Sequence, residues 1–263
     1  MFKNYNLKVG LVVLVALISV TVTAYAAHSW GSYHWARTAN PFTLKLGDNV
    51  SSVWDAYLGT TSADWSLSNV LDTTIVTGGT NPKNCRATSG RVEVCSAKYG
   101  FNGWLGIAQI WINGNGHIVK GTTKVNDSYF NTSTYNKPGW RNLVMCQEVG
   151  HAFGLDHQDE VFGNANLGTC MDYTDDPDGT LKSQLSNEHP NAHDYEQLEA
   201  IYAHLDSVTT VGQVFTGKGN NGNEDGEAKW GKSIRKDGNG RPAHYVHDLG
   251  NGEKVFTFVI WTE

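Results

Sequence analysis

Three absences from the 263-residue sequence each exclude a class of protein. After the apolar run at residues 9–22 there is no second run long enough to span a bilayer, which excludes a protein with several transmembrane helices. No C-x-x-C pair occurs, which argues against a zinc ribbon. Basic residues are not in excess, since the net charge is -6, and a nucleic-acid partner would require a basic face.

The first 26 residues have the three parts of a secretory signal peptide. Lys3 and Lys8 precede the apolar run (residues 9–22), and the small-residue pattern Ala-Tyr-Ala (24–26) follows it. The alternative is a membrane anchor, but the run is shorter than the roughly 20 residues that a bilayer span needs. We therefore expect a secreted protein, extracellular or periplasmic, with no membrane partner after cleavage. Losing two lysines and no acid takes its net charge from -6 to -8.

The four cysteines form an even set in a chain expected to be exported, so two disulfides are expected, in one of three connectivities. We favour Cys85 with Cys95, because this pair closes a short loop rich in turn residues. We pair Cys146 with Cys170, because this bond ties the segment after Cys146 to the segment just before Met171.

Hydrophobic periodicity predicts strands mainly in the first half of the chain and helices in the second. Strands are expected at residues 41–46, 70–76, 91–94, 105–112 and 118–125, and helices from residue 51 or 52 to 58, at 139–153 and at 193–205. Residues 216–228 are nearly free of apolar side chains, which is typical of a linker. Beyond them, alternating segments predict a small β-hairpin unit that is too small to fold alone and docks on the main domain. The expected division is 1–26 signal peptide, 27–207 catalytic domain, 208–228 linker and 229–263 C-terminal β unit.

Residues 147–157 read Gln-Glu-Val-Gly-His-Ala-Phe-Gly-Leu-Asp-His. On a helix, positions i and i+4 share a face, so Gln147 and His151 project together while Glu148 lies at the edge of that face. A glycine three residues after His151 can adopt a positive φ and turn the chain, so that His157 returns to the same point. Two imidazoles then converge, which suits zinc, and Glu148 is the candidate base for the attacking water.

This segment matches the zinc-protease motif H-E-x-x-H-x-x-G-x-x-H except that Gln147 replaces the first histidine. Further on, residues 169–173 read Thr-Cys-Met-Asp-Tyr, in which Met171 and Tyr173 match the S-x-M-x-Y turn of several metzincins. Over roughly residues 30–205 the chain therefore resembles the metzincins, most closely the matrixin-like secreted peptidases. The resemblance implies an α+β, zincin-like catalytic domain with a twisted mixed sheet, an active-site helix, a methionine turn and a closing helix.

The resemblance also implies a role for each site residue. His151 and His157 are similar to zinc ligands, Glu148 to the general base, Met171 to the apolar floor, and Tyr173 to a phenol that stabilises the oxyanion. The strand at residues 105–112 is similar to the edge strand along which these enzymes lay an extended peptide. No cysteine lies between the expected signal peptide and the first expected strand, so latency through a thiol on zinc is not expected.

Gln147 is the departure from the motif, because an amide oxygen is a weaker, neutral donor than imidazole. Three alternatives follow, in this order: a Gln-His-His site of reduced zinc affinity, a replacement ligand from elsewhere, or no catalytic metal. His117, His189 and His193 have no spacing that points them at the site, and we expect surface or packing roles for them.

We therefore expect a monomeric, secreted zinc endopeptidase that acts on peptide or protein substrates, with zinc-activated water and Glu148 as general base. The alternative is an inactive metzincin-fold module that binds a peptide or protein and has lost full zinc ligation at Gln147. One Zn²⁺ is expected. The acidic stretch 175–179 could add Ca²⁺, although a solvated turn explains it more simply. Asp156 and Asp172 are either partners of the ligand histidines or solvated turn residues.

Overall fold

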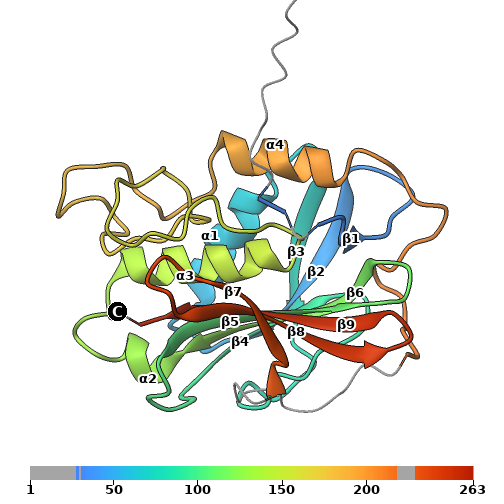
Figure 1. The fold of residues 1–263 in the computed structure, drawn as a ribbon, viewed down its shortest axis with the longest axis horizontal. Helices are drawn as coiled ribbons and strands as arrows, with labels where there is room; N and C mark the ends of the chain where they lie inside the picture. Colours follow the sequence, from blue (N-terminus) through green and yellow to red (C-terminus); the bar gives the residue numbers. More distant parts are fainter. Residues whose placement is uncertain (1–27, 30, 218–228, 263) are drawn as a thin grey trace, which may run out of the picture.

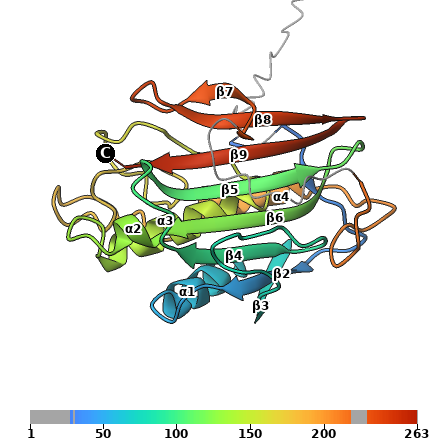
Figure 2. The ribbon, with the colours of Figure 1, turned by 90° about the horizontal axis from the view of Figure 1, so that it is seen from below.

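The computed structural model describes residues 28, 29, 31–217 and 229–262. The expected signal peptide, and residues 218–228 of the expected linker, lie outside the described residues. The described chain forms one mixed sheet with α1, α3 and α4 on the same face (Figures 1 and 2). The expected α+β class with a mixed sheet is confirmed. Within the described residues, no helix is long and apolar enough to cross a bilayer.

Strands dominate the first half of the chain, three helices follow, and three consecutive strands come last among the described elements. The strands are β1 (His34–Trp35), β2 (Phe42–Asn49), β3 (Leu71–Thr77), β4 (Val92–Ala97), β5 (Trp104–Ile112), β6 (His117–Asn126), β7 (Lys232–Lys236), β8 (Pro242–Gly250) and β9 (Glu253–Trp261). The helices are α1 (Asp55–Trp65), α2 (Asp127–Phe130), α3 (Pro138–His151) and α4 (Ala192–Ile201).

The sheet has the order β3-β2-β4-β6-β5-β9-β8-β7, with β1 paired beside β6. The pairs among β2, β3, β4 and β6 are parallel, whereas β5 and the three C-terminal strands pair antiparallel. β5 reads Trp-Leu-Gly-Ile-Ala-Gln-Ile-Trp-Ile and is buried along its whole length. A nearly continuous apolar run of this kind is typical of a strand covered on both faces.

β9 pairs with β5 from Trp104 opposite Trp261 to Ile112 opposite Lys254. The expectation that residues 105–112 form the edge of the sheet is therefore wrong, because β9 lies on that edge (Figure 2). The expected C-terminal hairpin is present as a three-stranded meander that continues the main sheet.

Several helix ends differ from the sequence prediction. α1 runs from Asp55 to Trp65 rather than from residue 51 or 52 to 58, and just before it the Trp54 N–H donates to the carbonyl of Ser51 over 2.8 Å in a turn. α4 ends at Ile201 rather than at residue 205, and the guanidinium of Arg37 donates to the carbonyl of Tyr202 over 2.7 Å just beyond it. The short elements β1 and α2 were not predicted.

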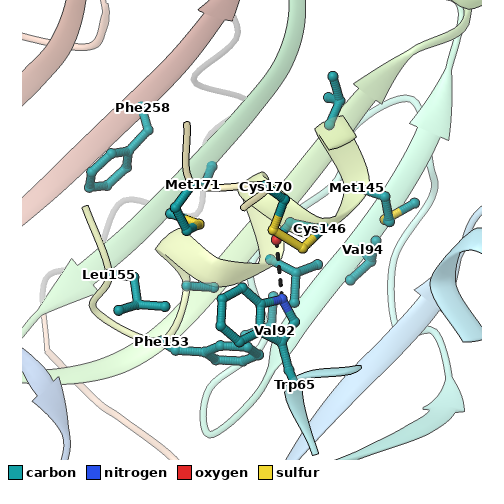
Figure 3. Close-up of a cluster of buried hydrophobic side chains, with 14 of the residues drawn as sticks. Trp65, Val92, Val94, Met145, Cys146, Phe153, Leu155, Cys170, Met171 and Phe258 are labelled. Carbon is teal, nitrogen blue, oxygen red and sulfur yellow. Dashed lines mark hydrogen bonds between the residues drawn. A yellow bond between two sulfur atoms is a disulfide. The ribbon is translucent and has the colours of Figure 1, made fainter. Parts of the chain in front are cut away.

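The core between the sheet and α3 positions the candidate site (Figure 3). The indole of Trp65 on α1 donates to the carbonyl of Cys146 on α3 over 3.2 Å. The disulfides Cys85–Cys95 and Cys146–Cys170 are both present, so the favoured pairing is confirmed. The second bond fixes α3 to the segment that carries Met171.

Candidate metal centre

The turn after α3 places the two motif histidines together. α3 ends at His151, and Gly154 then adopts a φ of 101°. A Cβ at Gly154 would lie 2.7 Å from the carbonyl oxygen of Tyr33, so both the conformation and the close approach require glycine. The chain turns back, and His157 faces His151 as the motif predicts.

The Nε2 atoms of His151 and His157 lie 2.9 Å apart, with the two rings nearly perpendicular. On the other side of each ring, Nδ1 of His151 contacts the carbonyl of Leu155 at 2.9 Å, and Nδ1 of His157 contacts Oε1 of Glu160 at 2.9 Å. These oxygens accept hydrogen bonds, so each Nδ1 carries the proton and the two Nε2 lone pairs face each other. Burial, and then the neighbouring His157, lower the pKa of His151 well below its usual range. Two facing lone pairs repel each other, and a cation bound by both nitrogens would remove this repulsion. The donor chemistry of the pair therefore fits a zinc ion.

Gln147 lies one helical turn before His151 and is fully buried. Its Nε2 donates to the carbonyl of Cys170 over 3.0 Å, which holds the side chain against the segment before Met171. Its Oε1 is buried, and among the described residues it has no hydrogen-bond partner. The free amide oxygen is the atom that a Gln-His-His ligand set would use, so the donor chemistry at this position also fits zinc.

Glu148 is fully buried, and β5 makes room for it with a glycine. A Cβ at Gly106 would lie 2.6 Å from Oε1 of Glu148. Burial raises the pKa of Glu148 well above its usual range, and the backbone N–H of Ile260 on β9 acts in the opposite direction. Neither carboxylate oxygen makes a hydrogen bond of regular geometry within the described residues. The raised pKa is that of a carboxyl that holds a proton more readily than an exposed one.

The side chain of Met171 packs against α3 at Gly150, and its predicted role as the apolar floor of a metal site stays a prediction. A Cβ at Gly150 would lie 2.7 Å from the sulfur of Met171 and 2.8 Å from the Trp65 ring, so the helix rests on both side chains (Figure 3). The Met171 N–H donates to the hydroxyl of Thr169 over 3.0 Å, which closes the turn.

Tyr173 is fully buried, with its ring centroid 4.5 Å from that of His157. Burial raises the pKa of Tyr173 well above its usual range, so the phenol stays a neutral donor. Its hydroxyl donates to the carbonyl of Val259 on β9 over 3.3 Å. The phenol therefore faces the site, where β9 supplies its acceptor.

β9 covers the histidine pair as well as the edge of β5. The ring of Phe258 stacks on His151 with centroids 4.4 Å apart and an angle of 16°. Val259 accepts from Tyr173, and the N–H of Ile260 lies on the side of Glu148. Three consecutive residues of β9 therefore lie against His151, Tyr173 and Glu148.

Sequence reasoning missed a charged network behind His157. Oε1 of Glu160 lies 2.9 Å from Nδ1 of His157, 3.2 Å from Nε2 of His244 on β8, and 2.9 Å from Nη2 of Arg235 on β7. Burial alone would raise the pKa of Glu160, but hydrogen bonds from both histidines lower it below its usual range. The carboxylate is therefore ionised and orients His157. The spacing of Glu160, three residues after His157, was a usable signal, whereas nothing in the sequence around His244 pointed to the site.

Four side chains of this network, Asp156, His157, Glu160 and His244, are close enough to hold a metal ion. The guanidinium of Arg235 already contacts the carboxylates of Asp156 and Glu160. It supplies the positive charge there, so we assign the network to positioning His157 rather than to a ligand set.

The two aspartates left open by the sequence are both buried, so the solvated-turn interpretation is wrong for both. Asp156 accepts from Arg235 and from the His157 N–H. Asp172 accepts from the Leu167 N–H over 2.8 Å and from the Asn187 amide over 2.8 Å. Asp172 therefore stabilises its own loop and does not orient a histidine.

The three histidines considered as replacement ligands pair with other partners. His117 lies 3.4 Å from Asp206, and His189 lies 2.7 Å from Asp64. The ring of His193 lies beside that of His28, with centroids 4.5 Å apart.

In the acidic stretch 175–179, the carboxylates are used by neighbouring donors. Asp176 accepts from the N–H groups of Leu181 and Lys182, and Asp178 accepts from Thr180. These contacts describe a closed loop, and a calcium ion there remains only a prediction.

No protein-family model and no curated protein matches this chain. Among solved structures, it is similar to high choriolytic enzyme 1, a hatching enzyme zinc-protease from the medaka fish Oryzias latipes. The likeness has a TM-score of 0.35 at 11% identity and covers 65% of this chain and 94% of that chain. A likeness this weak carries no argument about function, so the site must be judged from its own residues.

Proposed function

We propose that the protein is a zinc-dependent endopeptidase whose groove lies along β5, beneath α3. One observation carries the proposal: the peptide bond between Val259 and Ile260 lies in the site. Its carbonyl accepts from Tyr173, and its N–H lies on the side of Glu148. These are the contacts that the carbonyl oxygen and the leaving nitrogen of a cleaved peptide would need.

His151 and His157 would hold the zinc ion through Nε2, with the amide oxygen of Gln147 as third ligand. Bound zinc polarises a carbonyl as a Lewis acid and makes water more acidic. The carbonyl of Leu155 and the carboxylate of Glu160 hold the two imidazoles in the orientation that exposes Nε2.

Glu148 would carry the proton. Because burial raises its pKa, the carboxyl can take a proton from the attacking water and hold it until the peptide nitrogen leaves. Tyr173 would donate to the developing oxyanion from the position where it now donates to Val259.

The substrate would be an extended peptide that lies antiparallel to β5, as β9 does. Pairing with a strand uses backbone groups, which gives affinity without a strict sequence requirement. Because β9 occupies this place, hydrolysis requires β9 to leave β5. We infer that the chain as described is a closed form of the enzyme.

Export is part of the proposal. The two disulfides suit an oxidising compartment, extracellular or periplasmic, where the expected signal peptide would deliver the protein.

The test first cuts the chain before the C-terminal strands with a separate protease and then measures peptide hydrolysis by the cut protein. A recognition sequence for a specific protease is inserted between residues 217 and 229, the purified zinc-loaded protein is nicked there, and hydrolysis of a fluorogenic peptide mixture is followed. We expect hydrolysis to rise after nicking and to disappear in nicked Glu148→Gln. Glu199→Gln on α4 is the matched control and should keep the activity.

The inactive-module alternative makes a different prediction. If nicked protein with a full complement of zinc binds peptides but releases no product that depends on Glu148, the endopeptidase proposal is wrong.

A further inference from the structure

Three histidines outside the candidate active site surround one carboxylate. His34 belongs to β1, His117 begins β6, and His204 and Asp206 follow α4. We refer to these four residues as the His34 cluster. They join three parts of the chain that are distant in sequence.

Three residues of the His34 cluster, His34, His204 and Asp206, each offer a ligand atom within 4.8 Å of the other two, and His117 adds a contact to Asp206 alone. The Nε2 atoms of His34 and His117 each lie 3.4 Å from Oδ1 of Asp206, and Nε2 of His204 lies 3.7 Å from the same oxygen. Donors bound tetrahedrally to zinc at about 2.0 to 2.1 Å lie about 3.3 Å from one another.

The ring positions agree with the donor spacing. The centroid of His34 lies 5.1 Å from that of His117 and 4.7 Å from that of His204. Two imidazoles on one zinc ion, each bound through Nε2, have centroids about 5 Å apart.

Neighbouring groups orient both His34 and Asp206. Nδ1 of His34 lies 2.7 Å from the carbonyl of Ser32, which only accepts, so Nδ1 carries a proton. In the neutral ring, Nε2 then presents its lone pair to Asp206. Oδ2 of Asp206 accepts from the backbone N–H of Arg37 over 3.1 Å and from its Nη1 over 3.0 Å, which leaves Oδ1 facing the three imidazoles.

We propose that His34, His204 and Asp206 of the His34 cluster bind a divalent metal ion, and that zinc matches their two nitrogen donors and one oxygen donor. The side chain of His204 is 57% exposed and would close the site from the solvent side. Three protein donors would leave one position for water, and the ion would tie β1 to the segment after α4.

The test counts zinc in the full-length mature protein by mass spectrometry and follows Co²⁺ binding by its tetrahedral absorption bands. His204→Ala is the main variant, because this exposed side chain can be removed with little effect on folding. We expect it to weaken binding at the cluster by about 10-fold or more and to remove the stabilisation that zinc gives against thermal unfolding. His189→Ala, which removes another exposed histidine paired with an aspartate, should change neither.

The His151→Ala variant separates zinc binding at the His34 cluster from zinc binding at the candidate active site, on which the proposed function rests. A chain with this change should still bind one zinc ion that is lost on adding His204→Ala, even if the candidate active site binds none. If His204→Ala and His34→Ala both leave the zinc stoichiometry and the Co²⁺ spectrum unchanged, the cluster is only a set of ion pairs and the proposal is overturned.

Discussion

The hydroxyl of Tyr173 donates to the carbonyl of Val259, 86 residues further along the chain. The phenol that the metzincin resemblance assigns to an oxyanion is therefore bound to a carbonyl of the chain's own last strand. Substitution of Tyr173 tests what this hydrogen bond contributes.

Tyr173→Phe removes this donor and keeps the ring. We expect a loss of about 1 kcal/mol in the free energy of unfolding and faster amide exchange in β9. In the nicked protein we expect kcat to fall by about 10² with little change in KM, because the donor acts on the developing charge. Tyr195→Phe is the matched control, since its hydroxyl donates to the carbonyl of Asp64 on α1. An equal loss of kcat in both variants would remove Tyr173 from the mechanism.

Phe258→Ala tests whether β9 closes the site. The side chain is fully buried against His151, so we expect a loss of about 3 to 5 kcal/mol in the free energy of unfolding. We also expect Glu148-dependent peptide hydrolysis to rise in the intact chain, because the strand leaves β5 more often. Phe256→Ala on the same strand contacts Tyr33 instead and is the control for loss of stability alone. Equal activity in both variants would mean that Phe258 does not control access.

Gly106→Ala tests the position of Glu148. A Cβ there would meet the carboxylate at 2.6 Å, so we expect the side chain to move and hydrolysis by the nicked protein to fall by at least about 10-fold. Zinc content should stay the same. Gly121→Ala on β6 is the matched control, because its Cβ would meet no atom closer than 3.4 Å. Loss of zinc from Gly106→Ala would show a wider disturbance than the one proposed.

Gln147→His tests the altered ligand. Imidazole is a stronger donor than an amide oxygen, so we expect zinc to bind more tightly by about 10-fold or more in competition with a chelating dye. Gln147→Ala should bind more weakly than the wild type. Equal zinc affinity in all three proteins would show that the side chain at this position does not reach the metal.

Asp172→Asn tests how the folding stability depends on pH. Burial raises the pKa of Asp172 to about 6, above its usual value of 3.8. A carboxyl with a raised pKa binds its proton more tightly in the folded state, so folding stability falls as the pH rises from about 4 to about 6. A shift of about two units corresponds to at most about 3 kcal/mol. We expect Asp172→Asn to be more stabilising at pH 7 than at pH 4 in denaturant titrations. The same change at both pH values would contradict the assignment.

Local patterns predicted much of the fold. The apolar run of β5, the helical spacing of α3 and the turn at Gly154 depend on residues close in sequence, and each appeared near its predicted place. Both disulfides followed from cysteine spacing and the segments they join.

The pairing of β9 with β5 is not a local property, because it joins Trp104 to Trp261 across most of the domain. The burial of β5 on both faces was already present in its apolar sequence, but only the structure shows which strand covers its edge. His244 was missed for a similar reason. It lies on an ordinary alternating strand, and it meets His157 only because β8 follows β9 in the sheet.

β9 belongs to the same chain as β5, whose edge it covers. A strand tethered to its own binding site is present at an effective concentration on the order of millimolar. A free peptide at micromolar concentration would therefore compete against a roughly thousandfold excess of β9. Dilution does not weaken an intramolecular competitor of this kind, so the proposed binding of outside peptides along β5 would require an event that cuts or unfolds the C-terminal strands.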